Sequence, residues 1–129
     1  MNETNRINYL RIALWVFGLI FIFGIALLSR IWPSGWSWHA EGRSEYMEMI
    51  LGIYATLGIF LILAAQNPLK HLSLIWFTVW SSVVHGGIMA VQSFDGMHMG
   101  HLYGDVLALF VVAAVLAMLA PREGKVTAK

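Results

Sequence analysis

The chain has 129 residues, a length that fits one domain. Hydrophobic residues make up 59% of it and charged residues only 12%, against about 25% charged residues in a typical soluble domain. This balance excludes a soluble globular protein. The net charge of +1 leaves no basic stripe for nucleic-acid binding, and the absence of cysteine excludes disulfides and thiolate metal ligands.

The first apolar segment runs from about residue 9 to residue 29, and crossing a bilayer takes about 20 residues. Only Gly18 and Gly24 interrupt it, and small residues let membrane helices approach closely. The N-terminus resembles the start of a signal peptide. The apolar run is too long for one, however, and no small-residue cleavage pattern follows it. We therefore expect an uncleaved first span.

The segment from residue 30 to residue 44 is rich in turn-forming residues and contains Trp32, Trp36 and Trp38. Tryptophan is stable in the headgroup layer of a membrane, where the indole meets both lipid and water. The segment is therefore interpreted as an interfacial anchor. The alternative is a lid over a site on the same side of the membrane.

The second span is predicted at about residues 45–65, with Ser44 as its N-cap, and the third at about residues 71–92. The connection between them is short, so the two helices are expected to be antiparallel neighbours. The third span carries a polar stripe at helical spacing, which indicates a face turned into the bundle rather than toward lipid. The stripe consists of Thr78, Ser81, Ser82, His85, Met89 and Gln92.

The fourth span is predicted at about residues 97–120, because Pro121 ends it. Lys and Arg residues are more numerous at the end of the bundle that holds both termini, and positive charge favours the cytoplasmic side. We therefore expect an all-α integral membrane protein, a four-helix up-down bundle with both termini in the cytoplasm. Residues 1–129 would form a single transmembrane domain.

Ionisable residues within the predicted spans gather near the opposite, outer end. At a rise of about 1.5 Å per residue, His85 lies about 10 Å inward from the end of its span. On the same scale Glu48 and His101 lie about 5 Å inward, and Asp105 about 10 Å. An ionisable group at such a depth needs a partner, a metal ion or water. Side chains from three spans are therefore expected to converge on one site.

Two imidazoles and two carboxylates are a ligand set that suits a divalent transition metal, zinc or iron above all. Nearby methionines make copper a further alternative. A metal here could serve a membrane enzyme that acts on a lipophilic substrate, although the sequence does not decide whether a reaction is catalysed. The predicted metal ligands are Glu48, His85, His101 and Asp105, and the outer or second-shell candidates are Glu45, His98 and His39.

Other interpretations of the same residues stay open. His85 and His101 could be the axial ligands of a b-type haem in an electron-transfer protein. The polar stripe could form part of a transport or proton path, and His85 and Asp105 could simply hydrogen-bond as a polar plug. A non-catalytic accessory subunit of a membrane complex is a further alternative. The lipid bilayer is the expected partner, with self-association into a homo-oligomer open and no nucleic acid expected.

Three strings carry a resemblance to known sequences, namely residues 52–60 (GIYATLGIF), residues 80–87 (WSSVVHGG) and residues 101–105 (HLYGD). In these strings, its size and its pattern of spans, the chain resembles small bacterial inner-membrane proteins of unassigned function. The resemblance implies a four-span helical fold in the bacterial inner membrane. It carries over no catalytic residue.

Overall fold

The structure is a computed structural model that describes residues 1–37, 44–95 and 99–121 of the chain. Within these ranges all regular secondary structure is helical. Four helical stretches are long and apolar enough to cross a membrane, namely Glu3–Ile31, Glu45–Gln66, Pro68–Asp95 and Gly100–Leu119. The protein is therefore an all-helical, multi-pass membrane protein, as its composition predicts.

The first stretch begins earlier than the sequence suggests and is not a uniform helix. Helix α1 (Glu3–Leu19) starts at the N-cap Asn2, whose side chain accepts a hydrogen bond from the backbone N–H of Thr4 at 3.0 Å. It passes into a π-helical turn, η1 (Ile20–Gly24), and continues as α2 (Ile25–Ile31). Such a turn widens the helix locally, and π-helical turns occur frequently at functional sites.

After Trp32, a single short turn of helix, α3 (Pro33–Trp36), begins at a proline, as helices often do. Helix α4 (Glu45–Gln66) then starts at Ser44, whose hydroxyl accepts a hydrogen bond from the N–H of Met47 at 3.3 Å. This confirms the predicted N-cap.

A 3-10 turn, η2 (Pro68–His71), leads directly from α4 into α5 (Leu72–Asp95). Most of the polar stripe on α5 faces the interior: Thr78 and Ser82 are buried, and Ser81 and His85 are half-buried. Gln92 is exposed. The predicted orientation of this helix is therefore correct over most of its length.

The last stretch consists of α6 (Gly100–Tyr103) and α7 (Asp105–Leu119), separated by Gly104. A side chain at Gly104 would collide with the carbonyl oxygen of Gly35 in α3. A side chain at Gly100 would likewise collide with the carbonyl oxygen of Ser34. The two glycines thus let α6 lie directly against the backbone of α3, and the fourth span is interrupted where a continuous helix was expected.

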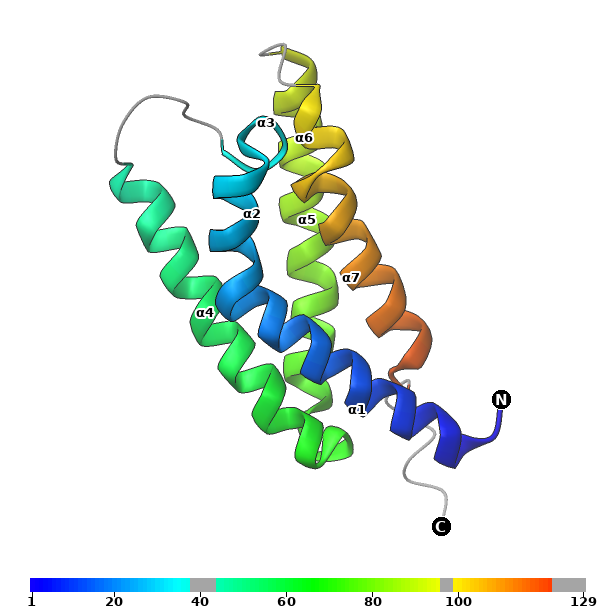
Figure 1. Ribbon diagram of the computed structural model, residues 1–129. Helices are drawn as coiled ribbons and strands as arrows, with labels where there is room; N and C mark the ends of the chain where they lie inside the picture. The colour runs from blue at the N-terminus through cyan, green and yellow to red at the C-terminus, as the bar shows by residue number, and fades with distance from the viewer. Residues whose placement is uncertain (38–43, 96–98, 122–129) are drawn as a thin grey trace.

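The helices pack in two pairs, α1 with α4 and α5 with α7, and α1 also contacts α7. Helices α4 and α5 contact each other only sparsely and diverge toward the upper end of the bundle (Figure 1). The backbones of α1 and α4 approach closely at Gly18 and Gly58, where an added Cβ at Gly58 would lie 2.5 Å from the Gly18 carbonyl oxygen. This approach explains why α4 packs on α1 instead of the sequence neighbour α5 that we expected.

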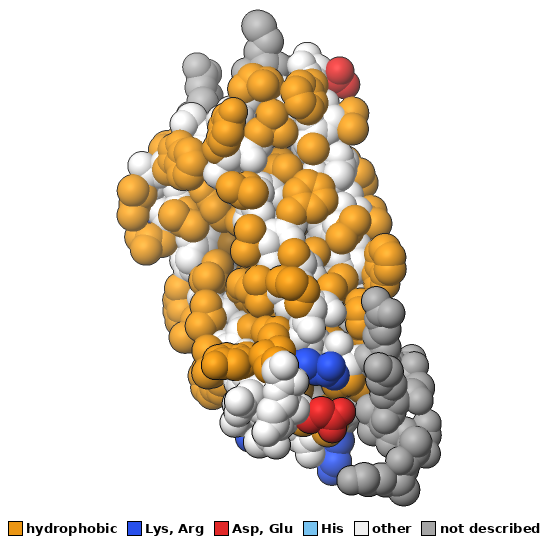
Figure 2. All heavy atoms as spheres, turned by 90° about the vertical axis from the view of Figure 1, so that its right-hand side faces the viewer, with side chains coloured by type: hydrophobic (Ala, Val, Ile, Leu, Met, Phe, Trp, Pro, Cys, Tyr) orange, Lys and Arg blue, Asp and Glu red, His pale blue; other side chains and the backbone are white. Residues whose placement is uncertain are grey.

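The apolar core fills the lower half of the bundle as drawn in Figure 1, near the start of α1 and the end of α7. Its fully buried side chains include Leu10, Leu14, Leu61, Ile75 and Leu116. On the face shown in Figure 2, apolar side chains cover the length of the molecule, and charged side chains appear only toward its two ends. Such a surface matches a bilayer, whose hydrocarbon interior accepts apolar but not charged groups.

Candidate functional site

A cavity of about 530 Å³ lies where α4 diverges from α5, and the described residues around it come from α1, η1, α2, α3, α4, α5 and α7. Its size falls within the range of about 300–1,000 Å³ that is usual for small-molecule sites. Most of the wall is apolar or aromatic, including Phe17, Phe21, Ile25, Leu109 and Val112. Polar groups are few, and Glu48, Tyr54, His85, Gln92 and Asp105 are among them.

Tyr54 of α4 and His85 of α5 form a hydrogen-bonded pair across the cavity wall. The Tyr54 hydroxyl lies 2.8 Å from Nδ1 of His85, and which atom donates depends on the imidazole tautomer. The ring of Phe21 from η1 packs edge-on against Tyr54, with ring centroids 5.1 Å apart. Tyr54 therefore connects three elements, and its contacts fix the orientation of His85.

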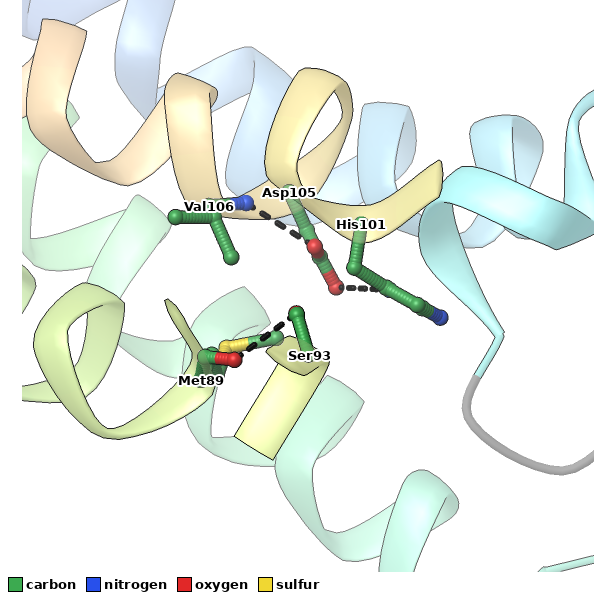
Figure 3. A network of polar contacts seen from close by, with 5 residues as sticks. All are labelled: Met89, Ser93, His101, Asp105 and Val106. Atoms are coloured by element: carbon green, nitrogen blue, oxygen red, sulfur yellow. Dashed lines mark hydrogen bonds and ion pairs between the residues drawn. The ribbon is translucent and has the colours of Figure 1, made fainter. Parts of the chain in front are cut away.

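A second polar pair joins α6 to α7. Nδ1 of His101 lies 3.0 Å from Oδ2 of Asp105, and Oδ1 of Asp105 accepts a hydrogen bond from the backbone N–H of Val106 at 2.9 Å. His101 is only 1% exposed. In Figure 3 this pair faces Ser93 and Met89 of α5, where the Ser93 hydroxyl donates to the Met89 carbonyl oxygen at 2.8 Å. The carboxylate also lies in the first turn of α7, where negative charge stabilises a helix.

The cavity brings together three of the four residues predicted as metal ligands, since Glu48, His85 and Asp105 all line it. His101 is not among the described lining residues, although its side chain contacts Asp105. Among the described parts of the chain, no three or more His, Asp or Glu side chains form a group that would hold a metal ion.

The residues predicted as outer or second-shell metal ligands are not found among the described residues that line this cavity. Glu45 is exposed at the start of α4 and is not among the lining residues. His39 and His98 fall outside the described residues. The haem alternative needs His85 and His101 to face one space, but only His85 belongs to the described cavity wall.

Sequence reasoning did not place Tyr54 and Trp36 in the site. Tyr54 lies nine residues into its helix, about 14 Å from the helix start at about 1.5 Å per residue. His85 lies at a comparable depth in α5. A tyrosine hydroxyl at that depth in an apolar span needs a polar partner, and this could have indicated that Tyr54 belongs to the site. Trp36 is only 9% exposed and lines the cavity, whereas Trp32 remains 41% exposed. The tryptophan-rich segment thus contributes a cover to the cavity, and Trp38 lies outside the described residues.

The cavity also has a lateral side. Ile20 of η1, Ile50 of α4 and Val111 of α7 line it and are between 38% and 46% exposed. Exposed apolar side chains on membrane-spanning helices contact lipid. Part of the cavity wall is therefore formed by apolar residues that also face the lipid.

Comparison with known proteins identifies one family. Residues 4–128 match DUF6632, a family of unknown function. The chain belongs to this family. No curated protein and no solved structure matches it.

Membership of DUF6632 agrees with the resemblance to small membrane proteins of unassigned function, and it adds no activity. The function must therefore be argued from the geometry of the cavity and its two polar pairs.

Proposed function

We propose that this DUF6632 protein binds a lipophilic small molecule within the membrane. The observation that carries the proposal is the cavity itself, whose apolar wall has a small set of polar groups, among them the Tyr54–His85 pair. Binding sites for small molecules typically combine a concave apolar wall with a few convergent polar groups. The hydrocarbon part of the ligand would contact the apolar wall, and its polar end would contact the pair.

The lateral exposure of Ile20, Ile50 and Val111 supports entry from the bilayer rather than from water. A ligand already dissolved in the membrane keeps its hydrocarbon chain in an apolar environment throughout. Specificity must then come from the polar end, since the hydrophobic effect hardly distinguishes the cavity from lipid.

Filling the cavity tests this function. Ala108 of α7 lines the cavity, whereas Ala114 of the same helix is exposed and is not among the lining residues. We expect wild-type protein in nanodiscs to bind 1-dodecylnaphthalene saturably, near one molecule per chain, measured by its fluorescence. Ala108→Phe should weaken this binding at least tenfold, because the ring occupies ligand space, while the control Ala114→Phe should not. Binding that does not saturate, or that both variants change equally, would contradict the proposal.

A metal ion is a second candidate ligand, because Glu48, His85 and Asp105 line the same cavity. Carboxylates and imidazole suit zinc or iron, with copper less favoured. These side chains would have to move closer together to coordinate one ion. A metal beside a lipophilic substrate could activate water or oxygen, which would make the protein a metal-dependent membrane enzyme.

Elemental analysis of detergent-purified protein distinguishes this candidate. Bound metal near one equivalent that is lost in His85→Ala, but kept in His71→Ala at the end of η2, would support it. Metal content far below one equivalent in the wild type would remove it. Binding of the naphthalene probe does not depend on this result.

We further propose that the protein is an up-down bundle in a bacterial inner membrane with both termini in the cytoplasm. Arg6, Arg11 and Lys70 lie toward the end of the bundle that holds the start of α1, which the excess of positive charge favours as cytoplasmic. The chain lacks cysteine, so single cysteines can report accessibility. In intact cells an impermeant maleimide should label Asp95→Cys, and should label Asn67→Cys only after lysis. The reverse pattern would invert the topology.

A further inference from the structure

Two acidic side chains lie in the otherwise mostly apolar wall of the cavity. Glu48 belongs to the first turn of α4, and Asp105 belongs to the first turn of α7. None of the described residues that line the cavity is Lys or Arg. The formal charges that the described wall places around the cavity are therefore negative.

The contacts that these carboxylates make within the protein leave them able to accept further hydrogen bonds. Oδ2 of Asp105 lies 3.0 Å from Nδ1 of His101, and Oδ1 accepts from the N–H of Val106. A carboxylate has about four lone-pair sites, so one contact does not exhaust either oxygen. Glu48 is exposed as well as part of the wall, so a ligand can approach its side chain.

The Tyr54–His85 pair offers a further acceptor in either tautomer. If the phenol donates to Nδ1 of His85, its oxygen keeps two lone pairs, and if Nδ1–H donates to the phenol, the oxygen keeps one. The other polar groups of the described wall can both donate and accept, and they belong to Ser37, Ser44 and Gln92. Such groups suit a ligand head of either sign, so the carboxylates decide which charge is favoured.

Charge and hydrogen bonding both favour a cation in this cavity. An anionic head would be repelled by Glu48 and Asp105, strongly so where the surroundings are apolar. An ammonium head is attracted by the same carboxylates, and its N–H groups are donors that match the acceptors of the wall. The cavity is also lined by the aromatic rings of Trp36 and Tyr46, and the faces of such rings attract cations.

We infer that the ligand is a cationic amphiphile, with an ammonium head among these acceptors and a hydrocarbon tail against the apolar wall. The inference rests on the proposed function and specifies its ligand class. Two sources offer this chemistry, namely a lipophilic amine and the ethanolamine head of a phospholipid. The phosphate of the phospholipid would lie near the two carboxylates, so the charges of the described wall favour the amine.

Competition against bound 1-dodecylnaphthalene in phosphatidylcholine nanodiscs tests the class on wild-type protein. The competitors are dodecylamine, dodecanol and dodecanoate at neutral pH, where an alkylamine is protonated, compared at equal concentrations in the membrane. We expect dodecylamine to compete about three- to tenfold better than dodecanol, the difference between a charge-assisted and a neutral hydrogen bond. Dodecanoate should compete less well than dodecanol. Equal competition by amine and alcohol, or a preference for the acid, would overturn the inference.

A further competitor separates the two sources of the ammonium group. Dodecanoyl-lysophosphatidylethanolamine carries the same kind of head beside a phosphate, on a tail of similar length. Weaker competition than by dodecylamine identifies the simple amine as the source, and stronger competition identifies the phospholipid head. Failure of both compounds to exceed dodecanol would overturn the inference.

Glu48→Gln tests the contribution of charge in the cavity wall. The substitution keeps the size of the side chain and should reduce the preference for dodecylamine over dodecanol about threefold or more. Glu45→Gln is the matched control, because Glu45 lies in the same first turn of α4 and is not among the described lining residues. It removes the same charge from the same end of the helix and should leave the preference unchanged. Equal effects of the two substitutions would show a general surface potential and would overturn the inference.

If Glu48→Gln proves misfolded, the competitor series on the wild type still decides the inference. Absence of saturable probe binding in the wild type overturns the proposed function. Saturable binding without a preference for the amine overturns only the ligand class.

Discussion

The two halves of the bundle differ in how their helices pack against one another. In the half near the start of α1, buried side chains of α1, α4, α5 and α7 form one continuous hydrophobic core. In the other half, α4 diverges from α5 and a cavity of about 530 Å³ remains, with polar side chains in its wall. The comparison shows that a buried core joins the helices at one end, while a partly polar cavity lies between them at the other.

Glycines allow close contact between helix backbones in both halves, although the helices in contact differ. Gly18 and Gly58 bring α1 and α4 together next to the core, and Gly104 brings α6 against Gly35 of α3 above the cavity. Small residues permit such backbone approach in membrane proteins, where van der Waals contact drives helix association. The π-helical turn η1 lies between these contacts along the first span and supplies Phe21 to the cavity wall.

The largest effect on stability is expected at the His101–Asp105 pair, which lies in the half of the bundle that contains the cavity. Asp105→Ala removes the carboxylate that lies 3.0 Å from the buried imidazole of His101. We expect the free energy of unfolding to fall by about 3 kcal/mol, the scale for loss of a buried charge-assisted hydrogen bond. Denaturation in mixed micelles, followed by circular dichroism, measures it. The control Asp95→Ala changes an exposed residue and should cost no more than about 0.5 kcal/mol.

If Asp105→Ala and Asp95→Ala are equally stable, the pair does not stabilise the cavity half. The two halves would then differ only in how closely their helices pack.

A smaller loss is expected from disturbing the close helix contact in the core half. A Cβ at Gly58 would lie 2.5 Å from the carbonyl oxygen of Gly18 and 2.9 Å from Cγ1 of Ile22. Gly58→Ala should therefore destabilise the protein by about 1–3 kcal/mol, as overpacking does. Gly52 lies on the same helix and has nothing within 4 Å of an added Cβ. Gly52→Ala should therefore be neutral or slightly stabilising in the same unfolding assay.

Equal losses in Gly58→Ala and Gly52→Ala would indicate a general effect of alanine in α4. The proposed role of the close approach between α1 and α4 would then be wrong.

The smallest effect on stability is expected at the Tyr54–His85 pair. Tyr54→Phe removes one hydrogen bond and keeps the ring that packs against Phe21, so it should cost about 1 kcal/mol. Tyr46 is 76% exposed on the same helix, so Tyr46→Phe is the control. Equal free energies of unfolding in Tyr54→Phe and Tyr46→Phe would show that the hydrogen bond to His85 does not stabilise the protein.

Part of the site could be predicted from depth along the helices. Glu48, His85 and Asp105 were expected at one end of the bundle from their distance to the span ends, and they do line one cavity. Depth does not specify rotation about the helix axis, so the partner of each residue was not predictable in this way. His85 pairs with Tyr54 and not with an acidic residue, and Asp105 pairs with His101 one turn earlier in the chain.

The sequence by itself determined four helical stretches that are long and apolar enough to cross a membrane, because hydropathy is a local property and lipid requires every backbone polar group to be satisfied within its own helix. It also determined the cap at Ser44 and the inward face of α5. Only the tertiary structure decided which side chains meet. Helix tilt and rotation depend on contacts between distant segments, here Gly18 with Gly58 and Gly35 with Gly104. The first contact lies beside the hydrophobic core, and the second lies at the end of the bundle where the cavity is lined by Tyr54, His85 and Trp36.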